Sequence, residues 1–253
     1  KIHLRWEHTG PRTWVRICGS GELWQPFAPR LAGGAGRRSV WKNLSGTRIR
    51  FREEHAHAPL AFQTEWFAAT GLGLVRSARL ERLGAVGAAL SVQVLDGVLN
   101  LLPPGVGVDT SSTMSSLADA YKWSESSAGG RLGLFTLYAK IWDRAEPKES
   151  FEALTVWHAG LPADTKTLLS AHQVADFCRS GTVQAESLTR GRRGAFLVNF
   201  DASVDAAGVD ALVDALVERG ARRPAGVACG ALARLVVRRA LRMTEHELAA
   251  LPQ

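Results

Sequence analysis

The side chains best suited to bind a metal ion lie together in the run Glu53-Glu54-His55-Ala56-His57. In an extended chain, alternation aims His55 and His57 the same way, with carboxylates beside them, and these are ligand types that zinc accepts. A third ligand cannot be identified from the sequence, and Pro59 follows closely. We therefore interpret the run as charged residues that cap a hairpin, and a metal site is the alternative.

A second candidate is the pair of carboxylates Asp143 and Glu146 in the run DRAEP. Enzymes that cleave glycosidic bonds use two carboxylates on either side of the scissile bond. Asp143 and Glu146 are close in sequence and are separated by Arg144, whereas catalytic pairs usually come from distant segments. We favour a local turn with an ion pair, and we predict no catalytic residue in this chain.

Basic residues are concentrated in the run Arg190-Gly191-Arg192-Arg193-Gly194. Guanidinium groups match the oxygens of phosphate, so the run could hold an anion. It also has the composition of a charged turn before the strand-like segment AFLVNF, which is our preferred interpretation. The other glycine-rich runs, 33–36 and 71–73, lack the strand-loop-helix context of a nucleotide-binding loop, so we predict no cofactor.

The chain contains eight Trp residues. The flat faces of aromatic rings can stack on the apolar faces of sugar rings, although most Trp residues in a large β protein belong to the core. Trp123 and Trp142 flank predicted turns, so they are the two that we expect to be exposed.

Composition places the chain among globular proteins, with 46% hydrophobic and 22% charged residues. The net charge of +7 invites a nucleic-acid interpretation, but 25 of the 31 basic residues are Arg and they are scattered along the chain. We predict neither nucleic-acid binding nor a membrane span, because no apolar run is long enough. Three widely separated cysteines indicate reduced thiols and a cytoplasmic protein.

Alternating segments dominate the first 200 residues and predict a mainly β protein with a large antiparallel sandwich. In the segment LVRSARLERL, alternation puts Arg76 and Glu81 on opposite faces of a strand. The expected strands read KIHLRW, TRIRFRE, LAFQTEW, LVRSARLERL, LSVQVLD, LGLFTLYAKIW, FEALTVW and GAFLVNF. Long irregular segments are expected at 26–38 and 103–116, and the second is rich in Gly, Ser and Thr.

The pattern changes after about residue 205, where apolar residues recur at helical spacing from Val209 to Val217. A second helix is predicted over about 227–243, and Thr244 with Glu247 forms a capping box that would open a third. These features predict a β domain over residues 1–204 and a short C-terminal helical linker over 205–253.

The stretch LSVQVLDGVLNLLPP, from Leu90 to Pro104, is the most distinctive in the sequence. An alternating strand runs into the pair Asp96-Gly97, which is typical of a tight turn. The double proline then ends the apolar segment. We expect a strand, a tight turn and a crossover that leads into the loop over 103–116.

Several phrases together carry a family resemblance: SVQVLDGVLNLLPPGV, SLADAYK, RLGLFTLYAKIWDRAEP, ALTVWHAGLP and RGRRGAFLVNF. Over about residues 41–200 the chain resembles the N-terminal region of bacterial proteins related to cellobiose and chitobiose phosphorylases. The resemblance implies a β-supersandwich similar to galactose-mutarotase domains, a helical linker, and an (α/α)6 barrel that carries the catalytic acid. We expect the chain to stop where such a barrel would begin, so no catalytic residue is carried over.

The resemblance implies a non-catalytic, carbohydrate-associated domain of a glycoside phosphorylase or hydrolase that acts on β-linked glucosides. Its expected partners are a β-glucan or oligosaccharide, its own catalytic barrel and a second copy of the chain. The residues predicted to face the glycan lie near the loop over 103–116 and are Asp96, Asn100, Asp119, Tyr121, Trp123 and Trp142. For Asp96 and Asn100 a structural role in a turn is the favoured alternative.

Two other functions compete with this one. The chain could be a stand-alone carbohydrate-binding module, which titration with a β-glucan would reveal. It could instead be a mutarotase-like sugar isomerase, which needs a convergent His and Glu. Among the seven His residues, His158 lies on a clear strand, but the sequence offers it no partner.

Overall fold

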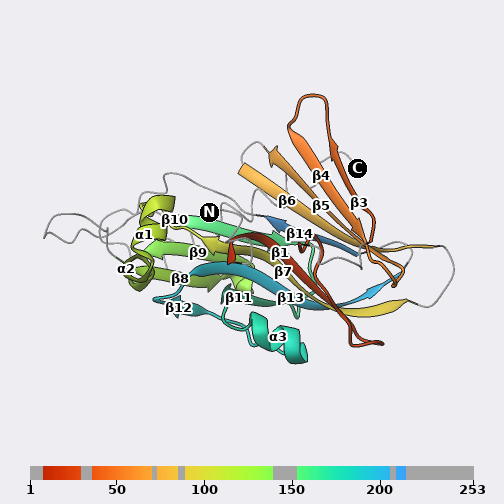
Figure 1. Ribbon diagram of the computed structural model, residues 1–253. Coiled ribbons are helices and arrows are strands. Elements are labelled where there is room, and N and C mark those ends of the chain that lie inside the picture. Colours follow the sequence, from red (N-terminus) through yellow and green to blue (C-terminus); the bar gives the residue numbers. More distant parts are fainter. Residues whose placement is uncertain are drawn as a thin grey trace, which may run out of the picture.

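A computed structural model describes residues 8–29, 36–69, 73–84, 89–138, 153–205 and 209–214. Within these ranges the protein is mainly β, and every pairing between strands is antiparallel (Figure 1). The mainly β prediction is therefore confirmed.

The described strands form two sheets. The smaller sheet has the order β11 (Lys166–Ser170), β13 (Gly194–Val204), β7 (Leu90–Leu101), β1 (Gly10–Ile17), β2 (Leu23–Trp24). The larger sheet has the order β12 (Leu188–Arg190), β8 (Lys122–Ser127), β9 (Leu132–Leu137), β10 (Ala153–Ala159), β14 (Val209–Asp214), β6 (Gly73–Arg82), β5 (Leu60–Ala69), β4 (Arg48–Glu54), β3 (Arg38–Lys42).

The main hydrophobic core lies between the two sheets. Its buried side chains come alternately from both, which is the arrangement of two sheets packed face to face. They include Val15, Val94, Phe196 and Phe200 of the five-stranded sheet and Leu60, Phe62, Leu80, Phe135 and Val156 of the nine-stranded sheet. The outer face of the five-stranded sheet is covered by helix α3 (Val174–Ser180), whose Phe177 is fully buried (Figure 1).

Strand β7 corrects the prediction of a tight turn at Asp96-Gly97, because the strand continues through both residues. The carbonyl of Phe196 in β13 occupies the place where a Cβ of Gly97 would lie, so only glycine permits this close pairing. Both faces of β7 are buried, which explains why its sequence departs from alternation.

The segment 103–116 is also more ordered than predicted. It contains the short helix α1 (Val108–Thr113) and the start of α2 (Ser115–Ala120), which lie at the end of the molecule near β8 and β9 (Figure 1). A single 3₁₀ turn, η2 (Ala128–Gly130), connects β8 to β9.

Strand β14 corrects the prediction of a helix that begins at Val209. Residues 209–214 pair with β10 on one side and β6 on the other, so their backbone groups complete the larger sheet. The spacing of the apolar residues in VDALVD fits the period of a helix as well as that of a strand. Pairing with two neighbouring strands favours the extended form. This strand lies beyond the predicted domain boundary at residue 204, and the predicted helices beyond residue 214 lie outside the described residues.

Candidate functional site

An aromatic and basic surface lies at one end of the nine-stranded sheet. Trp123 of β8 is partly exposed, and Tyr138, directly after β9, is 70% exposed. The two rings are nearly parallel, with centroids 6.2 Å apart. The guanidinium carbon of Arg190 lies 3.9 Å from the centroid of Trp123. We call these three residues the Trp123 patch.

The strand register explains why these side chains meet. Ser124 pairs with the core residue Phe135 and is buried, so Trp123 projects from the opposite face of the sheet. Arg190 of β12 pairs directly with Trp123. Tyr138 stands two residues beyond Thr136, the partner of Trp123 in β9. The patch is therefore built on three adjacent strands, on the face that points away from the main core.

Backbone hydrogen bonds fix the ends of these strands. The amide of Tyr138 donates to the carbonyl of Tyr121 at 2.8 Å, and the amide of Gly191 donates to the carbonyl of Lys122 at 3.0 Å. Gly191 has a φ of +67°, a conformation that glycine adopts without strain. The predicted turn over 190–194 is thus observed, and it is attached directly to β8.

Asp119, at the end of α2, organises the charges beside the patch. Its Oδ1 accepts a hydrogen bond from Lys122 Nζ at 2.6 Å, and its Oδ2 accepts one from Arg193 Nε at 3.3 Å. The Lys122 side chain is 2% exposed, so Asp119 provides the counter-charge that a buried ammonium requires. Asp119 consequently has a structural role next to the surface.

Tyr121, like Asp119, has a structural role next to the surface. Its ring is partly buried against the small cluster of Val106, Ala118 and Leu137, which joins the α1–α2 segment to β9. Asp119, Tyr121 and Trp123 thus lie at or directly before the start of β8. Trp142, Asp143 and Glu146 lie outside the described residues.

Asp96 lies between the two sheets and is 1% exposed. Arg76 of β6, which is equally buried, donates from Nη1 to Asp96 Oδ2 at 2.7 Å and from Nη2 to Oδ1 at 2.8 Å. Thr13 of β1 donates to the same Oδ1 at 2.5 Å. This buried trio of Arg76, Asp96 and Thr13 therefore links strands of both sheets, and its carboxylate is not on the surface.

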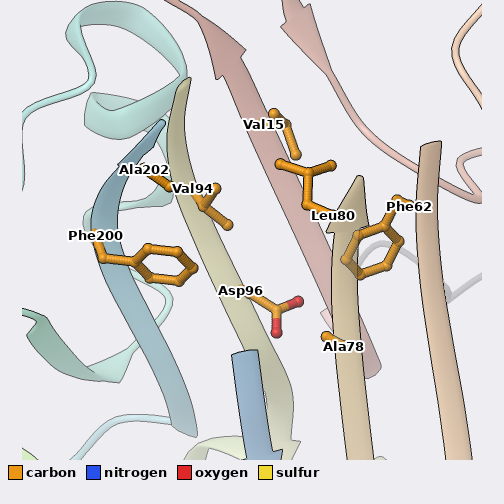
Figure 2. A pocket seen from close by; sticks show the side chains of 8 residues that line it. All are labelled: Val15, Phe62, Ala78, Leu80, Val94, Asp96, Phe200 and Ala202. Atoms are coloured by element: carbon orange, nitrogen blue, oxygen red, sulfur yellow. The ribbon is translucent and has the colours of Figure 1, made fainter. Parts of the chain in front are cut away.

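A small apolar cavity adjoins the trio, and the carboxylate of Asp96 borders it (Figure 2). The cavity has about the volume of one water molecule. Its other walls are the apolar side chains of Val15, Phe62, Ala78, Leu80, Val94, Phe200 and Ala202. A cavity of this size holds no sugar, so it is part of the core.

Asn100 occupies a bulge at the end of β7. Leu99 pairs with Ala195 and Leu101 pairs with Gly194, so Asn100 is left without a partner in β13. Its φ of +56° is a value that Asn tolerates better than most residues. Asn100 therefore lies in a bulge and not in the predicted tight turn, and it belongs to a different sheet from Trp123.

The histidine candidates are held by local contacts. His55 Nδ1 accepts hydrogen bonds from the amides of His57 at 3.1 Å and Ala58 at 2.8 Å, and its Nε2 lies 3.1 Å from Glu22. His55 thus caps the turn between β4 and β5. Glu53 accepts from Arg38 Nε at 2.8 Å. Within the described residues no group of three His, Cys, Asp or Glu side chains is arranged to hold a metal ion.

His158 of β10 is 6% exposed and packs near the ring of Phe196. Burial, with a smaller contribution from the charge of Arg131, lowers the pKa of His158 from its ordinary value of 6.5 to about 4. Its Nδ1 makes no hydrogen bond within the described residues. This buried, neutral histidine is a core residue, and among the described residues no carboxylate is paired with it.

The sequence patterns did not indicate the roles of two residues, Tyr138 and Arg76. Tyr138 belongs to the strand-like phrase LGLFTLYAKIW, in which alternation does not indicate that the strand ends at Leu137. Arg76 stands on the face of β6 that otherwise carries the apolar Ala78 and Leu80. A lone Arg in an apolar series is the signal that could have revealed its burial.

Comparison of the sequence with protein families finds no match, and no curated protein matches it either. Among the described residues, no helix is both long and apolar enough to cross a bilayer. The surface features that bear on function are the exposed ring of Tyr138, the nearly parallel ring of Trp123 and the guanidinium group of Arg190 beside it.

Proposed function

We propose that this chain is a non-catalytic domain that contacts carbohydrate through the Trp123 patch, in a glycoside phosphorylase or hydrolase acting on β-linked glucosides. The observation that carries the proposal is the parallel pair of Trp123 and Tyr138 on the outer face of the nine-stranded sheet. A β-linked glucoside presents flat, apolar ring faces, and aromatic rings of this kind stack on them.

The two packed antiparallel sheets support the finer proposal of a β-supersandwich of the galactose-mutarotase type. In that architecture we expect a helical linker and an (α/α)6 barrel to follow in the parent protein, and the domain to pack against that barrel. A second copy of the chain is a further proposed partner. The sequence phrases that resemble the phosphorylase-related proteins are the reason for this choice.

The test is calorimetric titration of the chain with short β-glucan oligosaccharides of different linkages. A surface with one open ring face is expected to bind weakly, with a Kd of about 1 mM, which corresponds to roughly 4 kcal/mol. The variants Trp123→Ala and Tyr138→Ala should each abolish measurable binding. Trp41→Ala is the matched control, because Trp41 is 48% exposed on β3 at the opposite edge of the same sheet.

Three outcomes are informative. Loss of binding in the patch variants alone supports the proposal, whereas equal binding by all variants, or no binding by the unaltered chain, contradicts it. A Kd below about 10 μM would instead favour a stand-alone carbohydrate-binding module, because such a module must hold its ligand without a second domain.

A further inference from the structure

The turn that joins β12 to β13 places positive charge beside the aromatic rings. Arg190 and Arg192 are exposed, and within the described part of the chain neither forms an ion pair. Arg193 in the same turn is 51% exposed and pairs with Asp119. Among the described residues, Arg190, which stacks on Trp123, and Arg192 of the same turn thus have no counter-charge.

The turn is held in place at both ends. Its Gly191 amide is bonded to β8, and Arg193 is bonded to Asp119. At Gly194 an added Cβ would lie 2.8 Å from the ring of Phe135, so the backbone there is pressed against the core. Charges carried by a fixed turn are oriented before a ligand arrives, which reduces the entropic cost of binding.

Two acidic side chains lie near these charges. Asp119 already serves both Lys122 and Arg193. Glu125 lies on the same face of β8 as Trp123, but it pairs in register with Leu188 and not with Arg190. Among the described residues, the three exposed Arg residues of the turn therefore outnumber the two carboxylates Asp119 and Glu125, which gives this surface an excess of positive charge.

Resting on the proposed function, we infer that the preferred ligand is an anionic carbohydrate, in which a sugar ring carries a carboxylate or phosphate. The ring would stack on Tyr138, whose face is open, and the oxyanion would be held by Arg190 and Arg192. Guanidinium groups present paired N–H donors that fit either oxyanion, and such charge-assisted hydrogen bonds are the strong ones. The stacking of Arg190 on Trp123 keeps its planar group beside the rings.

The test compares three kinds of ligand by calorimetry: neutral cello-oligosaccharides, β-linked glucuronates of the same length made by their oxidation, and glucose 6-phosphate. The acidic oligosaccharide should bind about tenfold more tightly than the neutral one at low salt, the gain expected from one charge-assisted contact. Most of that gain should vanish at about 0.5 M salt, where screening is strong. Glucose 6-phosphate against inorganic phosphate shows whether the oxyanion alone suffices.

Two variants locate the effect. Arg192→Gln should reduce the affinity for the acidic ligand about tenfold and leave the affinity for the neutral ligand unchanged. Arg190→Gln should weaken both, because it also supports Trp123. Arg179→Gln, an exposed Arg on α3 with a local ion pair, is the control that should change neither. Thermal unfolding of each variant establishes that it folds.

The results separate the inference from the function on which it rests. Trp123-dependent binding of the neutral ligand with no preference for the acidic one would overturn the inference and leave the proposed function standing. Absence of all sugar binding would overturn both. Binding of a short oligodeoxythymidine as tight as that of the glucuronate would also overturn it, since the surface would then recognise polyanions in general.

Discussion

Removal of the Asp96 carboxylate should destabilise the fold more than any other single charge deletion in the described residues. In Asp96→Ala, the guanidinium of Arg76 keeps its charge at 1% exposure but loses both hydrogen bonds, at 2.7 and 2.8 Å. Breaking a buried ion pair from one side costs about 3–5 kcal/mol, because a buried charge is left uncompensated. The loss of the Thr13 hydrogen bond adds about 1 kcal/mol.

The free energy of unfolding is measured by urea denaturation, with Trp fluorescence as the signal. The double variant Arg76→Met/Asp96→Leu removes both charges and should recover most of the lost stability, since apolar replacements of buried pairs are often neutral. The exposed pair Arg179–Asp176 supplies the control, and Asp176→Ala should cost less than about 1 kcal/mol. The reasoning would be refuted if Asp96→Ala lowered the free energy of unfolding by less than about 1 kcal/mol. It would also be refuted if the double variant were less stable than Asp96→Ala.

Three further predictions concern the buried positions His158 and Gly97 and the half-buried Glu186. The pKa of His158 is lower in the folded than in the unfolded chain, so the unfolded chain binds the proton first as the pH falls. The free energy of unfolding should therefore decrease by about 3 kcal/mol between pH 6.5 and pH 4. Chemical denaturation at a series of pH values should show that His158→Phe flattens this dependence. Gly97→Ala forces a Cβ against the Phe196 carbonyl and should lower the free energy of unfolding by about 1–3 kcal/mol, measured by chemical denaturation. In Glu186→Gln, the amides of Leu169 and Ser170, which donate to Glu186 at 2.7 and 2.9 Å, should exchange hydrogen faster, whereas unchanged exchange would contradict their dependence on the carboxylate.

Alternation predicted the strands that have one wet and one buried face. Segments such as TRIRFRE and LVRSARLERL became β4 and β6, with Arg76 and Glu81 on opposite faces as expected. Alternation failed for β7, because this strand is buried on both faces. Its Asp96-Gly97 pair therefore resembled a turn. The pairing of β14 could not be foreseen either, because it depends on two strands that are distant in sequence.

The candidate site was predicted only where local sequence determines it. Asp119, Tyr121 and Trp123 are close in sequence, so their proximity at the start of β8 follows from a single segment. Arg190 and Tyr138 join them through strand register, which no local pattern encodes. Asp96 was misplaced because its partner, Arg76, lies on the other sheet.

The position of β14 has a consequence for the order in which the protein assembles. β3, β4, β5 and β6 pair with their neighbours in sequence, as do β8, β9 and β10, so each group can form from local contacts soon after synthesis. These two groups share one sheet only because β14, from the last described stretch, pairs between β6 and β10. Until that strand emerges from the ribosome, both groups present an open edge, and the nascent chain is then most exposed to aggregation.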